Sequence, residues 1–281
     1  MTVPPASSEL SLPRLSQARA PLAREIEAID EAGQRRQVSI PAERDLTIYV
    51  DRRELVTLMT LGAFPEWLTL GYLRNQRLVA APQEVESITV DWEVGAAAVR
   101  TRGGIDRIEA RTARRVVTTG CGQGSVFGGI LQDLEAIELP TAQITRAQLT
   151  AIVDAVRRQE TVYKSTGSVH ACALFRGEHL QVFVEDVGRH NAIDTIAGWM
   201  WMQAPNRVQA LEGEPVVFYT TGRLTSEMII KAAQMGVAIV ISRSGITQMG
   251  HEIAQALDLC AIGRAMNQRF LCYSAAHRLQ V

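Results

Sequence analysis

The sequence VVFYTTGRLTSEMIIKAAQMGVAIVISRSGITQMGHEIAQALDLCAI, residues 216–262, decides the fold class of this chain. It alternates between short apolar runs and segments of helical composition. The apolar runs are 216–219, 237–241 and 259–262, and the helical segments are 226–235 and 248–257. Continuous apolar strands that alternate with helices are typical of a parallel sheet covered on both faces. The stretch therefore predicts an α/β fold.

The pattern continues upstream of this stretch. Residues 144–160 have apolar side chains at helical spacing, and Thr145 is a good N-cap, so we expect an amphipathic helix there. Two short strands follow, 171–175 and 180–184, joined by a tight turn at Gly177. A further helix with one apolar side comes next in the chain. These elements extend the predicted α/β domain.

The segment before residue 102 has a different pattern. The runs 46–50 and 54–60 predict a β-hairpin with a three-residue connection. Pro65 suits the first turn of a helix, since its missing N–H is not needed there. Two more strands are expected over 87–92 and 96–102. This part is predicted to include a smaller α+β domain.

The chain begins with a stretch that we expect to be flexible. Residues 1–43 are rich in Pro, Ser, Ala and charged residues, with at most one short helix, over 22–32. We therefore divide the chain into a flexible leader (1–43), an N-terminal part with the smaller domain (44–140) and a main α/β domain (141–281).

Composition excludes several functional classes. The net charge of -1 argues against bulk electrostatic binding to nucleic acid or to an anionic membrane. The sequence shows neither an apolar run long enough for a bilayer nor a secretory signal pattern. Its four cysteines lack C-x-x-C spacing, and the H-x-E and P-C-x-x-C motifs of a zinc deaminase are missing. We expect a cytoplasmic protein with reduced thiols and no metal site.

The segments after four predicted strands are polar and contain glycines and arginines. The arginines are Arg189, Arg223, Arg243, Arg264 and Arg269, and Gly222 and Ser242 lie in the same segments. Ligands of open α/β sheets bind at the carboxyl ends of the strands, and arginines beside a helix entrance suit a phosphate. Each segment alone is more typical of an ordinary helix cap with a surface arginine. Together, they predict an anionic ligand, a nucleotide.

One cysteine and two histidines are candidates for chemistry. Cys121 lies in TTGCGQGSVFGG (118–129), where backbone N–H groups of a glycine-rich turn would favour the thiolate. The same stretch is compatible with a packing loop that buries this thiol. His170 is flanked by strand residues, as a core histidine would be, whereas His190 lies among polar residues and suits acid–base or ligand-contact work.

Several motifs resemble the formate dehydrogenase accessory sulfurtransferase family. They are STGSVHACAL (165–174), VEDVGRHNAID (184–194), TTGRLTSEM (220–228), SRSGIT (242–247) and a tail that ends in Tyr273. The resemblance implies a cytidine-deaminase-like three-layer α/β sandwich without zinc, plus a smaller domain, usually as a homodimer. It also implies sulfur transfer from a cysteine desulfurase, as a cysteine persulfide, to the molybdenum cofactor of formate dehydrogenase.

The resemblance also implies a set of site residues. Cys121 would carry the persulfide. The molybdenum bis(molybdopterin guanine dinucleotide) cofactor would be bound as cargo, and GDP-like nucleotides would occupy the same site. Its contacts would come from His170, Arg189, His190, Gly222, Arg223, Ser242, Arg264, Ala265, Met266, Asn267, Gln268 and Arg269. The partners would be the formate dehydrogenase catalytic subunit and the desulfurase.

Two features depart from the family pattern. The family commonly has C-x-x-C at the turn, but here the sequence is Cys-Gly-Gln-Gly over 121–124. Residues 266–268, Met-Asn-Gln, replace an Arg-Gly-Gly-like run in the tail. Three hypotheses follow: Cys121 alone relays sulfur; the protein is a non-catalytic chaperone that delivers the cofactor to apo formate dehydrogenase; or it is a nucleotide-binding regulatory module.

Overall fold

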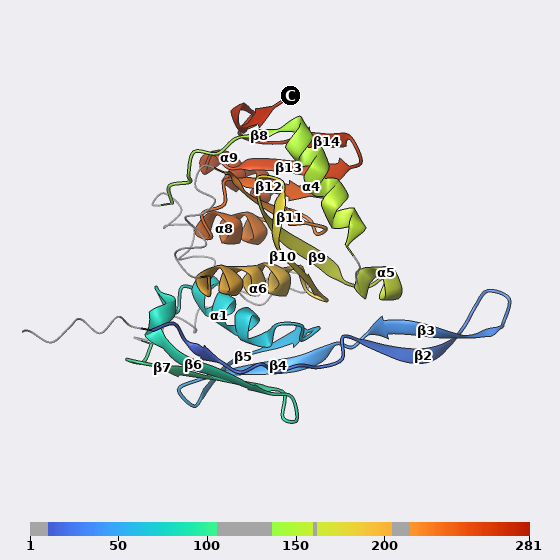
Figure 1. Ribbon diagram of the computed structural model, residues 1–281, viewed down its shortest axis with the longest axis vertical. Coiled ribbons are helices and arrows are strands. Elements are labelled where there is room, and N and C mark those ends of the chain that lie inside the picture. Colours follow the sequence, from blue (N-terminus) through green and yellow to red (C-terminus); the bar gives the residue numbers. More distant parts are fainter. Residues whose placement is uncertain (1–10, 106–136, 160–161, 204–213) are drawn as a thin grey trace, which may run out of the picture.

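The computed structural model of the protein describes residues 11–105, 137–159, 162–203 and 214–281 (Figure 1). Its larger part is built on a six-stranded sheet in the order β10-β9-β11-β12-β13-β14. The strands are β9 (His170–Arg176), β10 (His179–Asp186), β11 (Val216–Thr220), β12 (Ile239–Ser242), β13 (Cys260–Met266) and β14 (Arg269–Cys272). The prediction of an α/β fold is confirmed.

The sheet is mixed rather than parallel. Strands β11, β12 and β13 run parallel, whereas β9 is antiparallel to both β10 and β11, and β14 is antiparallel to β13. The expectation of a parallel sheet from residues 216–262 is therefore right for β11, β12 and β13, and antiparallel strands flank them. The reason is connection length: a tight turn such as that at Gly177 joins only antiparallel neighbours, and a parallel pair needs a crossover.

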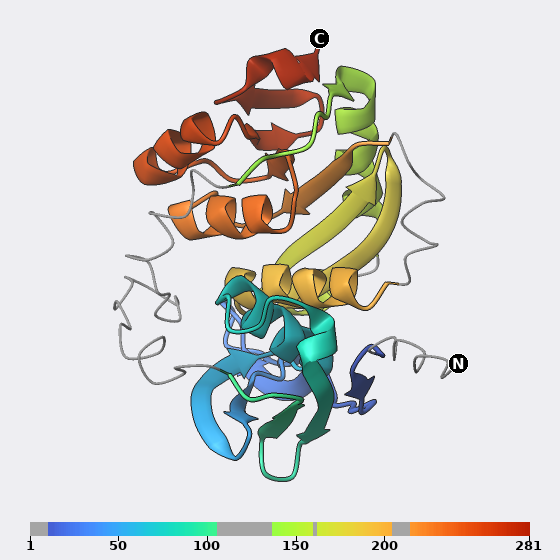
Figure 2. The same cartoon turned by 90° about the vertical axis from the view of Figure 1, so that its left-hand side faces the viewer.

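Helices cover both faces of the sheet (Figures 1 and 2). Helix α4 (Arg146–Arg158) packs on one face, and α6 (Arg189–Trp201), α8 (Ser226–Gln234) and α9 (Gln248–Ala256) pack on the other. The predicted N-cap of α4 is confirmed, because Gln148 N donates to Thr145 Oγ1 at 3.2 Å, a contact that typically stabilises a helix by about 1 kcal/mol. Short elements complete this part: α5 (Val162–Thr166), β8 (Ile144–Thr145), η3 (Ala276–Arg278) and β15 (Leu279–Gln280).

A second sheet forms from the N-terminal part, in the order β1-β6-β7-β4-β5. It comprises β1 (Arg14–Leu15), β4 (Arg44–Val50), β5 (Arg53–Thr60), β6 (Val85–Asp91) and β7 (Ala96–Thr101), with η1 (Pro82–Glu84) before β6 and helix α1 (Pro65–Asn75) packed against the sheet. The predicted hairpin, helix and strand pair are confirmed. The hairpin connection has two residues rather than three, Asp51 and Arg52, both at positive φ as a tight hairpin turn requires.

Helices α1 and α6 join the two parts of the molecule through a crossing made by two glycines. A Cβ atom on Gly71 would lie 1.6 Å from the carbonyl oxygen of Asp194, and one on Gly198 would lie 1.9 Å from that of Trp67. The backbones can approach this closely only because both positions lack a side chain. The middle and second half of α6 are thereby held against α1, between the N-terminal sheet and the six-stranded sheet.

The segment expected to be a flexible leader contains strands. Strands β2 (Ala23–Ile29) and β3 (Arg35–Pro41) form an antiparallel hairpin that projects from the body in Figure 1. The helix expected over 22–32 is therefore wrong. The turn accounts for the difference: Asp30 Oδ1 accepts hydrogen bonds from Ala32 N and Gln34 N, both at 2.9 Å, and Gly33 takes a positive φ.

The described residues contain neither a membrane-spanning helix nor a cluster of metal-binding side chains. In this part of the chain, no helix is long and apolar enough to cross a membrane. Nor do three or more His, Cys, Asp or Glu side chains gather there as a metal site would require.

Candidate functional site

The carboxyl ends of β10, β11, β12 and β13 meet at one edge of the six-stranded sheet, as predicted. They do so because β9, antiparallel to both neighbours, leaves β10 running in the direction of β11. Backbone hydrogen bonds connect the following segments: Arg243 N donates to Thr220 O at 3.0 Å, and Arg264 N donates to Ser244 O at 2.7 Å. The Ser244 hydroxyl donates to Thr221 O at 3.0 Å. The strand ends thus form a continuous rim.

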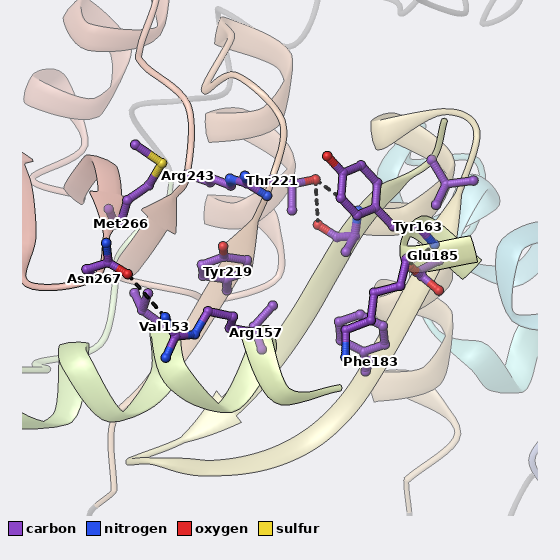
Figure 3. A pocket seen from close by; sticks show the side chains of 15 residues that line it. Val153, Arg157, Tyr163, Phe183, Glu185, Tyr219, Thr221, Arg243, Met266 and Asn267 are labelled. Carbon is purple, nitrogen blue, oxygen red and sulfur yellow. Dashed lines mark hydrogen bonds between the residues drawn. The ribbon is translucent and has the colours of Figure 1, made fainter. Parts of the chain in front are cut away.

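A pocket of about 410 Å³ opens beside this rim, under helix α4 (Figure 3). Its volume lies within the range of small-molecule sites, roughly 300–1,000 Å³. The apolar and aromatic lining residues are Val153, Val156, Tyr163, Val169, Ala171, Phe183, Tyr219, Ala265 and Met266. The other lining residues are Arg157, Lys164, Glu185, Thr221, Arg243 and Asn267. The pocket combines apolar walls with a mainly cationic set of side chains.

The short helix α5 is anchored to the sheet by Glu185. The Glu185 carboxylate, at the end of β10, accepts hydrogen bonds from Val162 N at 2.6 Å and from Tyr163 N at 3.1 Å. A carboxylate is favoured at a helix N-terminus, where the first N–H groups lack partners within the helix. This contact places Tyr163 and Lys164 at the pocket (Figure 3).

A side-chain contact joins α4 to the turn between β13 and β14. Arg157 Nη1 donates to Asn267 Oδ1 at 3.3 Å, drawn as a dashed line in Figure 3. Asn267 has a φ of 55°, a left-handed conformation that Asn adopts more readily than most residues. The turn and the last part of α4 therefore close one side of the pocket together.

The charge at the pocket is positive. Arg157, Lys164 and Arg243 contribute cations, and the one carboxylate among the described lining residues is that of Glu185. Burial raises the pKa of Tyr219 to about 12, although the nearby Arg243 guanidinium opposes this shift, so the phenol is neutral at physiological pH. A neutral aromatic surface beside cations suits an anionic ligand with a planar ring.

His170 lies at the start of β9 and lines a neighbouring hollow that shares Tyr163, Thr221 and Arg243 with the pocket. Burial lowers the pKa of His170, and the positive charges of Arg189 and Arg223 lower it further. The imidazole is therefore held neutral beside two arginines. Of the residues predicted to bind the cofactor, His170, Ala265, Met266 and Asn267 line these two hollows.

Arg189 and Gly222 are brought together. A Cβ atom on Gly222 would lie 2.9 Å from Cδ of Arg189, so the arginine stem packs directly on this glycine. Arg223 is exposed. Ser242 is fully buried, and its hydroxyl donates to Gly222 O at 2.7 Å and accepts from Ser244 N at 2.9 Å. In this structure, Ser242 supports the loop rather than presenting its hydroxyl at the surface.

His190 is placed in the interior. It is 4% exposed, and its Nε2 lies 3.3 Å from Glu227 Oε2 on α8. Lys231, one turn further along α8, lies 2.8 Å from Asp194 and 3.6 Å from Glu227. Asn75 of α1 donates to Asp194 at 2.7 Å. These side chains form a buried ionic cluster between α1, α6 and α8, whereas a polar turn was expected around His190.

The predicted loop after residue 262 is a β-hairpin. Strand β13 continues to Met266, and β14 begins at Arg269, with an irregularity in the pairing between Gly263 and Met266. Arg264, Gln268 and Arg269 are exposed on it and lie outside the set of described residues that line the pocket. The strand predicted over 259–262 is therefore longer than expected, because its last residues pair with β14 at the edge of the sheet although they are polar in part.

Comparison with known proteins agrees with this architecture. The sequence model of the FdhD/NarQ family matches residues 41–280. This chain belongs to that family. The sulfur carrier protein FdhD of Listeria monocytogenes serotype 4b is 28% identical over 255 residues, which cover 89% of this chain and 95% of that protein. The protein of the same name from Bacillus pumilus is 30% identical over 240 residues, covering 84% and 88%.

A solved structure shares the fold. The crystal structure of a formate dehydrogenase accessory protein from Desulfotalea psychrophila superposes with a TM-score of 0.72 at 24% identity and covers 92% of this chain and 100% of that one. The backbone of that structure therefore follows this chain through nearly its whole length.

The structure describes the pocket but not the candidate for the persulfide. Cys121 lies outside the described residues. Conversely, sequence reasoning did not select Arg157, Tyr163, Lys164 or Phe183, which come from helices over the sheet face and from inside β10. The one available signal was the basic end of the helix over 144–160, which by itself is typical of any helix C-terminus.

Proposed function

We propose that this member of the FdhD/NarQ family is a sulfur carrier for the maturation of formate dehydrogenase. Sulfur would be held as a persulfide on Cys121 and passed to the molybdenum bis(molybdopterin guanine dinucleotide) cofactor, bound as cargo. The names of the relatives support the sulfur-carrier and accessory roles. The pocket is the single structural observation that supports cofactor binding.

The pocket suits one end of a guanine dinucleotide. Tyr163, Phe183 and Tyr219 offer aromatic surface for a planar base, and Arg157 and Arg243 can donate charge-assisted hydrogen bonds to phosphate oxygens. A neutral His170 adds a donor or acceptor without adding charge. GDP would therefore bind in the same place as the nucleotide end of the cofactor.

Loading the sulfur needs only one nucleophilic thiol, whereas passing it to the cofactor as sulfide needs two electrons from a reducing thiol outside this chain. The Cys121 thiolate would attack the terminal sulfur of a persulfide on the cysteine desulfurase, forming a new S–S bond while the desulfurase cysteine leaves as a thiolate. The desulfurase and the catalytic subunit of formate dehydrogenase are thus the proposed partners. A homodimer, a cytoplasmic location and a cytidine-deaminase-like sandwich belong to the same proposal.

A second candidate function follows from residues 121–124. Because the sequence there is Cys-Gly-Gln-Gly, Cys121 has no cysteine three residues on with which to release sulfur by forming a disulfide. A non-catalytic chaperone that binds the cofactor and delivers it to apo formate dehydrogenase would use the same pocket without a persulfide.

Two measurements separate these functions. The full chain is incubated with a cysteine desulfurase and cysteine, and peptide mass spectrometry then looks for added sulfur on Cys121, with the buried Cys172 as internal control. Formate dehydrogenase activity is measured in cells carrying the Cys121→Ala variant. Added sulfur and lost activity support the carrier. No added sulfur and full activity would leave the chaperone, and absence of GDP binding by calorimetry would remove both.

A further inference from the structure

Two thiols face each other across the hairpin that forms the edge of the six-stranded sheet. The Sγ atoms of Cys260 on β13 and Cys272 on β14 lie 4.0 Å apart. Both side chains contact the core under α4. We propose that Cys260 and Cys272 are a redox-active dithiol, which a hydroperoxide oxidises to an intramolecular disulfide. The proposal does not involve Cys121 and does not depend on the sulfur-carrier function.

The two thiols differ in access to solvent. Cys260 is fully buried, whereas Cys272 is partly exposed on a strand of four residues at the edge of the sheet. Cys272 is therefore the thiol that a small oxidant meets first. Cys260 lies further inside the protein, next to Cys272, where its sulfur can attack an oxidised Cys272 sulfur.

The pKa values of the two thiols also indicate that Cys272 reacts first. A hydrogen bond with the Cys260 thiol lowers the pKa of Cys272 to about 7, so a substantial fraction is thiolate at neutral pH. The same contact, together with burial, raises the pKa of Cys260 far above its usual range. Cys272 is the attacking thiolate, and Cys260 is the resolving thiol.

The geometry needs a small movement for closure. A disulfide has an S–S length of about 2.05 Å, so the sulfur atoms must approach by about 2 Å. Hydrogen bonds fix the backbones on both sides of the pair: Tyr273 N donates to Ala261 O at 2.8 Å, and Ser274 Oγ donates to Leu259 O at 2.7 Å. Cys272 pairs with Ile262 and therefore lies diagonally across the hairpin from Cys260, so closure needs rotation of the Cys272 side chain together with a local approach of the two strands.

The reaction balances in two steps. The Cys272 thiolate attacks one oxygen of the hydroperoxide, the O–O bond breaks, and Cys272 becomes a sulfenic acid while water or an alcohol leaves after protonation. The Cys260 sulfur then attacks the Cys272 sulfur, its proton leaves with the displaced hydroxyl as water, and the S–S bond forms. Two thiols have lost two electrons, and one peroxide has gained them.

The chain supplies its own matched control in Cys172. This thiol is fully buried and donates to Thr220 Oγ1 at 3.3 Å, and burial raises its pKa to about 12. It therefore shares the interior position of Cys260 without the partner thiol that makes oxidation productive. In the native chain, it should react with a hydroperoxide at least about tenfold more slowly than Cys272 does.

The test is oxidation of the native full chain with hydrogen peroxide near neutral pH, followed by alkylation, digestion and mass mapping. We expect a peptide pair joined through Cys260 and Cys272, reversed by a dithiol reductant, and the same product in a Cys121→Ser chain. In Cys260→Ser, a dimedone adduct should accumulate on Cys272. In Cys272→Ser, Cys260 should stay reduced.

Three results would overturn the proposal. They are absence of the joined peptides after oxidation, oxidation of Cys272 no faster than that of Cys172, and undiminished oxidation of Cys260 in the Cys272→Ser chain. The map of the unsubstituted chain decides the first two even if a serine variant does not fold. A chain that forms this disulfide but never gains sulfur on Cys121 would keep this proposal and lose the proposed function.

Discussion

Removing the buried ammonium group of Lys231 should strongly destabilise the protein. In Lys231→Met, the aliphatic part of the lysine side chain is replaced by a side chain of similar shape. The carboxylates of Asp194 and Glu227 lose the ammonium group that lies 2.8 Å and 3.6 Å from their oxygens. Asp194 is 0% exposed, so water cannot replace the lost charge. Breaking a buried ion pair in this way costs about 3–5 kcal/mol, against a total stability of about 5–15 kcal/mol.

The loss should depend on pH, and the sign follows from Asp194. Burial raises the pKa of Asp194 to about 6, and Lys231 opposes that shift, so without Lys231 the pKa rises further. A carboxyl whose pKa is higher in the folded than in the unfolded state loses stability as pH rises through the folded value. The cost of Lys231→Met should therefore be largest near about pH 8 and shrink near about pH 5, where Asp194 is protonated.

Urea unfolding followed by circular dichroism at both pH values measures these costs. The control is Lys164→Met, at the other lysine of the chain, which is exposed at the pocket and should change stability by no more than about 0.5 kcal/mol. The double variant Asp194→Asn with Lys231→Met should recover part of the loss, because it leaves one buried carboxylate fewer. A cost for Lys231→Met below about 1 kcal/mol at the higher pH, or an equal cost at both, would refute the reasoning.

Three further outcomes are expected. Gly71→Ala should lower the free energy of unfolding, measured in urea, by about 3 kcal/mol or more, because its Cβ would overlap a backbone carbonyl. The control Gly245→Ala, whose Cβ would have no atom within 4 Å, should leave the stability nearly unchanged. Equal effects of the two substitutions would contradict the argument from the helix crossing. Arg243→Ala should weaken GDP binding in calorimetry about tenfold or more, while Arg146→Ala, exposed at the start of α4, should leave it unchanged. Because the pKa of His170 is lowered in the folded state, the unfolded state binds more protons between the folded and unfolded pKa values. The free energy of unfolding should therefore fall as pH drops through that range. In His170→Gln, the dependence of the unfolding free energy on pH should be flatter in this range.

The elements of the main domain could be predicted because local signals and tertiary packing agree there. Thr145 caps α4, and the apolar runs that became β11 and β12 are buried on both faces. The projecting hairpin was missed for the opposite reason. Its β2 segment alternates charged and apolar residues, but Glu25, Glu27 and Ala28 are also good helix formers, and only pairing with β3 decides between the two.

The rim was predictable, but most of the pocket was not. The alternation of apolar runs and helical segments places the segments after the strands at one sheet edge, and the structure shows His170 and residues 265–267 lining neighbouring hollows there. Arg157 reaches the pocket through the packing of α4, and Tyr163 reaches it because Glu185 anchors α5. No local sequence pattern predicts either contact. His190 was expected in a polar turn because of its polar neighbours, but it lies in the first turn of α6, and its partner Glu227 lies on α8, 37 residues further along the chain.

The scarcity of amines has a practical consequence. The chain contains just two lysines, of which Lys231 is 3% exposed inside the ionic cluster and Lys164 is exposed at the mouth of the pocket. Apart from the α-amino group, a mild acylating reagent will thus modify essentially one position on the native protein. Protection of Lys164 from acylation becomes a direct readout of occupancy, and a fluorophore attached there would report ligand arrival without any engineered residue.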